Sequence, residues 1–496
     1  MSQLSDRRSR LWLMRTLAVA LSLTPLIVVE LIFRSIETPV EEALDRDPMI
    51  DLSQLKPLFV RNEGASGECW EIPESRLNFF RPDWFLAEKP AGLRRIFVLG
   101  GSTVQGRPYA IETAFSTWLR LRLEANQPQT RFEVVNCGGI SYASYRVAKI
   151  LDEVLEHKPD AIVIYTGHNE FLEDREYAEV REMGVLRRSV ATVAGEIATV
   201  RWIRRALLEP PPRERLMPGE VDARLDHRGG LDRYHRDEQW KTGVERHFEL
   251  TLQRMVQRVQ AAGVPLVLCV PASDLVRTPP FKVELPADSS DQSRRELADL
   301  WGQARDVDAS EADRIQAAED CLAIDPKHAG AHYLLGRNLF ERGEVTAARS
   351  HLTSARDHDV CPLRATASIM RSVTNVATEQ QIPLITTPEL LDQRDWLGQR
   401  RPDGIPDPGF FVDHLHPSVS GHQRIGEAIA DALVAMDWVR QGDDESDRRY
   451  AELVEQQMSG LKPGYFARGR QRLEGLRQWA AGRAGQELSD LPPSAP

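Results

Sequence analysis

Short runs of β-branched and apolar residues alternate along the chain with segments whose apolar residues recur every three or four positions. The runs predict buried strands at 96–99, 132–135, 161–165, 264–270 and 383–387. The periodic segments predict amphipathic helices at 113–126, 145–157 and 244–259, with a last one carrying Ile425, Ile429 and Leu433. Because strands that alternate with helices form parallel β-α-β units, the pattern predicts a three-layer α/β/α domain with a parallel sheet.

A helical stretch rich in alanine and leucine separates the fourth predicted strand from the fifth. Trp301-Gly302 and Leu335-Gly336 lie 34 residues apart, which is the tetratricopeptide period. We therefore expect a helical insertion at 291–362 that resembles two degenerate tetratricopeptide repeats, with an ordinary inserted helical hairpin as the alternative. Two repeats are fewer than such repeats need to stand alone, so they are expected to pack on the α/β domain. Cys321 and Cys361 are candidates for a disulfide here.

An apolar run at the N-terminus follows the basic residues Arg7, Arg8 and Arg10. It extends over 11–33, and its charged residues lie near the ends, where they can reach the membrane surface. The basic flank places residues 1–10 in the cytoplasm and the body outside. We therefore predict a single-pass signal anchor with an extracytoplasmic, periplasmic-side body. Cleavage at Ala18-Val19-Ala20, which would release the protein, is the alternative.

The remaining segments complete the expected domain organisation. Residues 34–90 are rich in proline, charge and aromatic residues, which indicates a non-helical linker that packs aromatic side chains on the next domain. The α/β domain is then discontinuous, with parts at 91–290 and 363–437. An insertion at 171–239, with a helix expected at 186–208, is the candidate lid or substrate wall. A charged tail at 438–496 is expected to hold helices at 450–458 and 468–479.

Composition narrows the possible functions. The 496 residues carry a formal net charge of −11, and no basic stripe offsets it, so a nucleic-acid partner is not expected. The five cysteines are scattered and form no C-x-x-C pair, which argues against a structural zinc site.

The first predicted strand ends in Gly100-Gly101-Ser102-Thr103. The carboxyl ends of strands in open α/β sheets are where ligands bind. No lysine follows as in a P-loop, the glycines are out of register for a dinucleotide-binding motif, and Val104 replaces the last glycine of a G-x-S-x-G elbow. A tight turn with a capping serine is the structural alternative to a nucleophile.

A candidate base for Ser102 lies in the loop before the last predicted helix of the domain. Asp413 precedes His416 by three residues, a spacing at which the carboxylate can hold Nδ1–H and leave Nε2 to accept a serine proton. A metal cluster of Asp413, His414 and His416 is the alternative, but no further ligand motif completes it, so neither a metal nor a cofactor is expected. A helix-capping pair without chemistry is the other alternative.

Four short blocks, each at a predicted strand end or in the last loop, make the chain resemble the SGNH (GDSL-type) hydrolases. That resemblance covers 94–175, 262–275 and 383–435 and implies a flavodoxin-like fold. The sequence departs from the family pattern at Gly101, where the family often has aspartate, and at Glu170, where it has aspartate. The blocks are Gly100-Gly101-Ser102-Thr103, Asn136-Cys137-Gly138-Gly139-Ile140-Ser141, Gly167-His168-Asn169-Glu170 and Asp413-x-x-His416.

The resemblance implies a role for each matched residue. Ser102 would be the nucleophile, His416 the general base and acid, and Asp413 the residue that orients His416. The oxyanion would be held by the Ser102 N–H, the Asn169 side chain and a backbone N–H of the second block. The family's glycine falls at or beside Ser141, with Gly139 two residues earlier, so the second-block donor stays open. Capping of a following helix is the structural alternative for Asn169.

Together these features predict a membrane-anchored extracytoplasmic serine esterase. Its expected substrates are small acyl esters, with O-acetyl groups on carbohydrates or envelope polymers first among them, and its repeats are a candidate protein-binding arm. An O-acyltransferase that uses the same triad is the first alternative, because pocket shape and water access decide the acceptor. A non-catalytic scaffold whose repeats carry the function is the second.

Overall fold

The computed structural model describes residues 14, 24, 47, 49–64, 67–175, 217–286, 289–392 and 404–483. The predicted anchor at 11–33, apart from Met14 and Thr24, and the helix predicted at 186–208 lie outside these residues. No helix in the described part of the chain combines the length and the apolar character that crossing a bilayer requires. The chain divides into two units, Met1–Ser53 with Arg175–Met217 and Gln54–Asp174 with Pro218–Pro496. The second unit holds the elements below.

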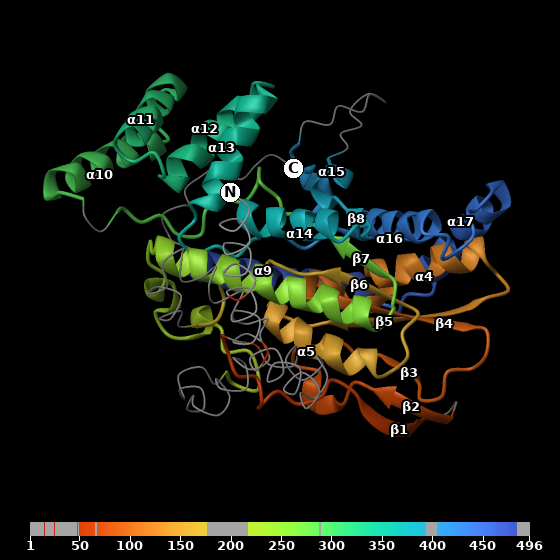
Figure 1. The fold of residues 1–496 in the computed structure, drawn as a ribbon. Coiled ribbons are helices and arrows are strands. Elements are labelled where there is room, and N and C mark those ends of the chain that lie inside the picture. Colours follow the sequence, from red (N-terminus) through yellow and green to blue (C-terminus); the bar gives the residue numbers. More distant parts are fainter. Residues whose placement is uncertain are drawn as a thin grey trace, which may run out of the picture. The chain divides into compact units, whose positions relative to one another are not determined.

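A five-stranded parallel sheet forms the centre of this unit (Figure 1). Its strands lie in the order β5-β4-β6-β7-β8, with the first strand in the chain next to the centre. Gly100 pairs with both Gly138 and Tyr165, so three strands end level at one edge. The predicted three-layer α/β fold with a parallel sheet is confirmed. The strands are β4 (Leu93–Gly100), β5 (Arg131–Gly138), β6 (Ala161–Tyr165), β7 (Leu266–Cys269) and β8 (Leu384–Ile385).

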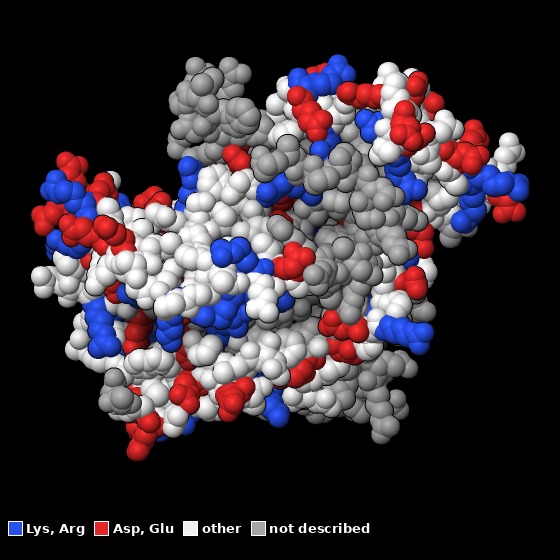
Figure 2. Space-filling view, turned by 180° about the vertical axis from the view of Figure 1, so that it is seen from behind, with Lys and Arg blue, Asp and Glu red and all other residues white. Residues whose placement is uncertain are grey.

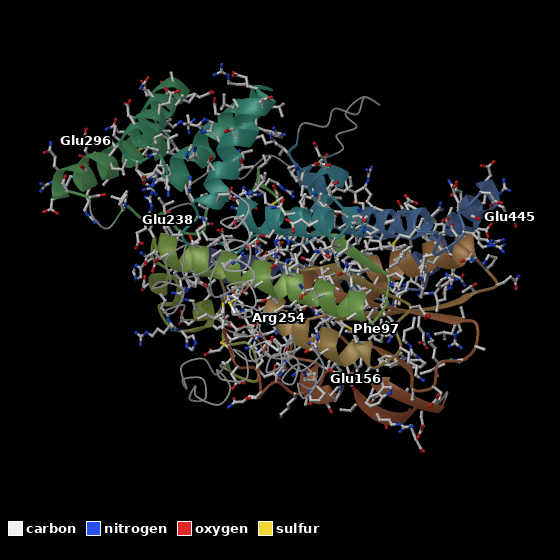
Figure 3. The ribbon with its side chains drawn as sticks, viewed as in Figure 1. Phe97, Glu156, Glu238, Arg254, Glu296 and Glu445 are labelled. Atoms are coloured by element: carbon white, nitrogen blue, oxygen red, sulfur yellow. The ribbon has the colours of Figure 1, made fainter. Side chains whose placement is uncertain are left out.

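Helices cover both faces of the sheet. The helices α5 (Ser144–Leu155), α9 (Glu238–Ala261) and α14 (Ala367–Glu379) pack together on one face. On the other face α4 (Phe115–Asn126) packs against α16 (Val419–Ala435). Sheets covered on both faces have strands that are apolar throughout, and Phe97 of β4 is accordingly fully buried (Figure 3).

Short helices connect the larger elements. Two are single α-helical turns, α3 (Ser102–Gln105) and α15 (Thr387–Leu390). The others are 3-10 turns at Glu74–Arg76, Ile111–Thr113, Arg224–Asp226, Gly230–Arg233 and Pro408–Phe410.

The segment before the α/β domain forms a small antiparallel sheet of β1 (Val60–Gly64), β2 (Gly67–Glu71) and β3 (Trp84–Leu86). The sequence predicted a non-helical segment with packed aromatic residues, but it did not predict these strands. The aromatic packing is present: the Phe59 and Phe85 rings meet edge to face with centroids 5.0 Å apart. The strands escaped prediction because β1 is exposed along its whole length and shows no apolar alternation.

Four helices form the insertion between β7 and α14, and neighbours along the chain pack on one another. They are α10 (Asp291–Arg305), α11 (Glu311–Ile324), α12 (Ala329–Glu341) and α13 (Val345–Asp357). The Tyr333 hydroxyl donates to the Val276 carbonyl oxygen (2.8 Å), and Arg236 forms an ion pair with Asp325 (2.7 Å). The insertion therefore packs on the α/β domain, while its assignment as tetratricopeptide repeats stays a prediction.

The disulfide expected between Cys321 and Cys361 is wrong. Both residues are buried free thiols, and they belong to separate hydrophobic clusters. Cys321 packs in the cluster that contains Trp301, and Cys361 packs in the one that contains Tyr234.

The charged tail folds back onto the α/β domain as α17 (Asp444–Ser459) and α18 (Tyr465–Arg483). Tyr450 packs in one cluster with Trp118 of α4. Glu445 of α17 and Glu296 of α10 are exposed (Figure 3). On the face of the molecule that Figure 2 shows, which is seen from behind relative to Figure 1, basic and acidic side chains lie side by side.

Candidate active site

Ser102 stands where β4, the neighbour of the central strand β6, gives way to α3. A Cβ atom on Gly100 would lie 2.0 Å from the Tyr165 carbonyl oxygen, so the close approach of β4 and β6 requires glycine there. Gly101 then caps α3, which begins at Ser102. The serine side chain is thus fixed at the carboxyl edge of the sheet, and Ser102 is only 7% exposed.

The loop before α16 is folded so that Asp413 and His416 face each other. Phe411 and Pro417 form an isolated antiparallel bridge, and the Val412 N–H donates to the His416 carbonyl oxygen (2.9 Å). The Asp413 carboxylate accepts from the N–H groups of Leu415 (3.0 Å) and His416 (2.8 Å). The three-residue spacing of Asp413 and His416 therefore corresponds to a tight turn, which the Asp413 carboxylate closes by accepting these two hydrogen bonds.

A continuous hydrogen-bonded chain joins this turn to the serine. Nδ1–H of His416 donates to Oδ2 of Asp413 (2.7 Å), and the Ser102 hydroxyl donates to Nε2 of His416 (2.8 Å). The order Asp–His–Ser and the opposite ring nitrogens are those of a general-base-activated nucleophile. The structure brings all three predicted residues together.

The surroundings of the turn keep Asp413 ionised. Burial by itself would raise the pKa of the Asp413 carboxyl, but His416, His414 and the hydrogen bonds to it outweigh burial and hold that pKa well below its usual range. Burial lowers the pKa of His414 to about 4 and that of His168 to about 3. These two histidines are therefore neutral at pH 7. They do not compete with His416 for the negative charge of Asp413.

Asn169 follows β6 and lies directly against the serine turn. Its Nδ2 donates to the Tyr142 carbonyl oxygen (3.0 Å), and a Cβ on Gly101 would lie 2.6 Å from the same nitrogen. An amide nitrogen carries two protons, so one remains for a ligand beside Ser102. The alternative interpretation of Asn169 as a helix cap is wrong, because a turn and no helix follows it.

The two candidate donors of the second block, Gly139 and Ser141, differ in whether their backbone N–H is already hydrogen bonded within the described residues. The Gly139 N–H already donates to the Gly100 carbonyl oxygen (3.0 Å), so the expectation for Gly139 is corrected. Ser141 has a φ of 61°, the left-handed region that favours glycine. Its N–H has no hydrogen-bond partner among the residues that the structure describes. The backbone thus keeps at Ser141 the conformation of the glycine expected there.

Glu170 and Tyr142 lie beside Asn169 in the fold and position it, and no role was predicted for either from the sequence. The Glu170 carboxylate accepts from both the N–H (2.8 Å) and the hydroxyl (2.9 Å) of Ser144, which ties the loop after β6 to the start of α5. The departure from the usual aspartate at Glu170 was the available signal. Tyr142, whose carbonyl oxygen holds Asn169, carried no sequence signal.

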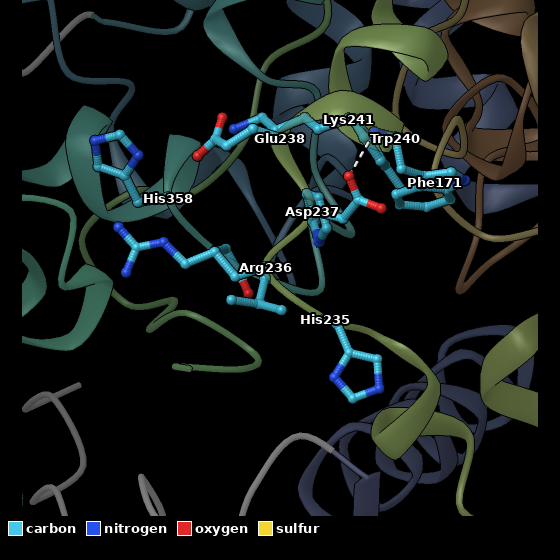
Figure 4. A pocket seen from close by; sticks show the side chains of 11 residues that line it. Phe171, His235, Arg236, Asp237, Glu238, Trp240, Lys241 and His358 are labelled. Atoms are coloured by element: carbon cyan, nitrogen blue, oxygen red, sulfur yellow. Dashed lines mark hydrogen bonds between the residues drawn. The ribbon is translucent and has the colours of Figure 1, made fainter. Parts of the chain in front are cut away.

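A small pocket lies at the start of α9, apart from the three triad residues, none of which lines it (Figure 4). The Asp237 carboxylate caps α9 by accepting from the Trp240 N–H (2.8 Å), and His358 lies on another wall. Its volume of about 30 Å³ has room for little more than water. No group of three or more His, Cys, Asp or Glu side chains in the described ranges is arranged to hold a metal ion.

Several solved structures are similar to this chain at low sequence identity, and lipases and esterases are among them. One is a lipase/acylhydrolase from Enterococcus faecalis, with 13% identity, 69% of this chain and 96% of that chain covered, and a TM-score of 0.30. Another is an acetylxylan esterase from Geobacillus stearothermophilus, with 16% identity, 70% and 97% covered, and a TM-score of 0.30.

A GDSL-family lipolytic protein from Desulfitobacterium hafniense is similar at 12% identity, with 68% and 99% covered and a TM-score of 0.28. No family model matches the chain, and a search of curated proteins finds no match. The functional assignment below therefore rests on the side chains at the site.

Proposed function

We propose that this protein is a serine esterase of the SGNH type that removes small acyl groups through an acyl-enzyme. The observation that carries the proposal is the hydrogen-bonded chain from Asp413 through His416 to Ser102. A serine hydroxyl is a poor nucleophile until a base accepts its proton, and the 2.8 Å contact with Nε2 supplies that base.

The geometry supports the following steps. Ser102 Oγ attacks the ester carbonyl carbon while His416 Nε2 takes its proton, and Asp413 stabilises the imidazolium that results. The carbonyl oxygen becomes an oxyanion, for which the Ser102 and Ser141 N–H groups and the Asn169 amide are donors. The tetrahedral intermediate collapses, and the leaving alcohol takes the proton from His416. Water then repeats the sequence on the acyl-enzyme and restores Ser102.

Location and substrate class are further parts of the proposal. The basic residues before the apolar run at 11–33 support a membrane anchor with the catalytic body on the extracytoplasmic side. A body in the cell envelope would meet acylated polysaccharides, and the burial of Ser102 favours a small group such as acetyl over a long chain. We therefore propose O-acetyl groups on carbohydrates or envelope polymers as the substrates.

The decisive experiment is active-site labelling of the full-length protein. A phosphonofluoridate probe followed by peptide mass spectrometry should label Ser102. Ser102→Ala and His416→Ala should each lower hydrolysis of an activated acetyl ester by about 10³-fold or more, as removal of triad members does elsewhere. The matched controls are Ser459→Ala and His235→Ala, in exposed residues of α17 and of the segment before α9.

The outcomes separate the possible activities. Label on another residue, or wild-type rates in both triad variants, would refute the triad. Adding an acceptor sugar to the wild-type assay distinguishes hydrolysis from transfer, because a transferase passes the acyl group to the sugar and releases acylated acceptor in place of free acid.

A further inference from the structure

Three arginine side chains come together beside the Ser102 turn. The Arg107 N–H donates to the Ser102 carbonyl oxygen (3.2 Å), which fixes Arg107 one turn from the nucleophile. Arg472 of α18 reaches the same loop, where its Nη1 donates to the carbonyl oxygens of Pro108 (3.2 Å) and Tyr109 (2.9 Å). The third member is Arg81, whose pKa is lowered by burial and by repulsion from both other guanidiniums. The cluster therefore concentrates positive charge at the site.

In the part of the chain that the structure describes, these half-buried guanidiniums lack the carboxylate partners that Arg146 and Arg95 have. Arg146 pairs with Glu173 at 2.7 Å and Arg95 with Glu133 at 2.8 Å. Within the described ranges, no carboxylate lies within ion-pair distance of the three clustered arginines, and Nε of Arg81 is buried without a hydrogen-bond partner.

The carboxylates nearest the cluster do not neutralise it. Glu112 acts on Arg81 from an exposed position. Asp413 acts on Arg107, and its oxygens also accept from His416 and Leu415. Three guanidiniums therefore stand against two carboxylates among the described residues, which leaves an excess of positive charge beside the nucleophile.

Packing holds the cluster in place. The Tyr109 and Tyr465 rings stack with centroids 6.1 Å apart, and the Ala110 N–H donates to the Tyr465 hydroxyl (3.1 Å). A Cβ on Gly469 would lie 2.1 Å from the Tyr109 ring, so the loop and α18 are in close contact. Arg107 and Arg472 are consequently held near each other on two packed segments, although their charges repel.

We propose that Arg81, Arg107 and Arg472 form an anion-binding subsite, and that the natural ester carries a carboxylate, phosphate or sulfate group close to the acyl group that is removed. The inference rests on the proposed esterase function and specifies its substrate class. Guanidinium groups bind such oxyanions with paired, charge-assisted hydrogen bonds. With a net charge of −11, the protein as a whole repels an anionic substrate, and the subsite provides the local attraction.

The test compares esters that differ only in charge. Phenyl acetate is the neutral member, 4-acetoxybenzoate carries a carboxylate, and 4-acetoxyphenyl phosphate carries a phosphate. We expect the wild-type protein to prefer an anionic member in kcat/KM, and Arg107→Gln and Arg81→Gln each to lower that preference about tenfold or more, the usual size of a charge-assisted contact. The anionic ester with the larger kcat/KM relative to phenyl acetate shows whether the subsite prefers a carboxylate or a phosphate. Arg470→Gln, an exposed neighbour on α18, is the matched control.

A second measurement does not depend on the folding of any variant. For the wild-type protein, 4-hydroxybenzoate should inhibit phenyl acetate hydrolysis about tenfold more strongly than the neutral 4-hydroxybenzamide, and added salt should reduce the difference. Two results would overturn the subsite while esterase activity and Ser102 labelling stand. One is equal inhibition by 4-hydroxybenzoate and 4-hydroxybenzamide. The other is a preference for anionic esters in the Arg107 and Arg81 variants that equals the preference of Arg470→Gln. Absence of turnover for all esters and of labelling overturns the esterase proposal itself.

Discussion

A Cβ atom placed on Gly101 would lie 2.6 Å from Nδ2 of Asn169. Carbon and nitrogen atoms do not approach so closely without a bond, so the Asn169 amide occupies the space that a side chain at position 101 would take. The missing side chain thus lets a donor from the end of β6 lie against the turn that carries Ser102. The two residues belong to different strand ends and meet because β4 and β6 are neighbours.

Gly101→Ala is therefore expected to affect catalysis more than folding. The added methyl group displaces the end of a flexible side chain, which costs little stability but moves one oxyanion donor. Loss of such a donor typically lowers kcat by about 10²–10³, and we expect an effect approaching that range with a change in Tm of no more than a few degrees. Steady-state kinetics and thermal unfolding measure the two effects.

Gly302→Ala on α10 is the control, because a Cβ there meets nothing within 4 Å. It should leave kcat unchanged and slightly raise stability, as alanine does in helices. Wild-type kcat in Gly101→Ala would show that the Asn169 amide is not a donor in the reaction.

Substitutions at Ser141 should separate its backbone conformation from its side chain. At a φ of 61° a non-glycine residue is strained by about 1 kcal/mol. Ser141→Gly removes the strain and keeps the N–H, so esterase activity should persist and stability should rise slightly, by about 0.5 kcal/mol once the greater freedom of unfolded glycine is subtracted.

Ser141→Val provides the opposite case. A β-branched residue is strongly disfavoured at positive φ, so both stability and activity should fall, by about 1–3 kcal/mol for stability. Denaturant unfolding and acetyl ester hydrolysis measure both. If Ser141→Gly loses activity while it stays folded, the serine side chain and not the backbone N–H contributes to the reaction.

The sheet and the Ser102, Asn169 and Asp413–His416 positions were predictable because their signals are local. Each is a short polar motif that follows an apolar run or closes a loop before an amphipathic helix. A parallel sheet brings the carboxyl ends of its strands to one edge, so the ends that carry Ser102 and Asn169 had to be close. The spacing of Asp413 and His416 and the resemblance of the Asn169 block to the SGNH hydrolases therefore sufficed to name the expected partners of the serine.

Features that depend on tertiary packing were not predictable. Whether Gly139 or Ser141 has an available N–H depends on which of the two is already hydrogen bonded and on the φ angle of Ser141. The sequence Gly138-Gly139 indicates neither of these. Arg472 lies in a helix that the sequence predicted only as part of a charged tail, yet tyrosine stacking brings it to the Ser102 loop. The same holds for β1, which has no apolar alternation of its own.

The burial of His422 should make the stability of the protein depend on pH. The residue is fully buried in α16, its ring stacks on Phe115 (centroids 6.0 Å apart), and neither ring nitrogen has a partner in the part of the chain that the structure describes. Burial lowers the pKa of His422 from 6.5 to about 3. The folded protein therefore keeps the ring neutral over a range of pH in which the unfolded chain binds a proton, so stability is lost as pH falls from 6.5 towards 3.

His422→Phe should abolish this loss because phenylalanine has no proton to bind. Keeping the His422 ring neutral lowers the wild-type free energy of unfolding by about 2 kcal/mol at pH 5 relative to pH 8. The free energy of unfolding of His422→Phe minus that of the wild type should therefore grow by this amount between pH 8 and pH 5. His168 and His414 titrate in both proteins and cancel in the difference. His235→Gln, in an exposed side chain, controls for the removal of a histidine as such. A difference between wild type and His422→Phe that is equal at both pH values would mean that His422 binds its proton as easily folded as unfolded.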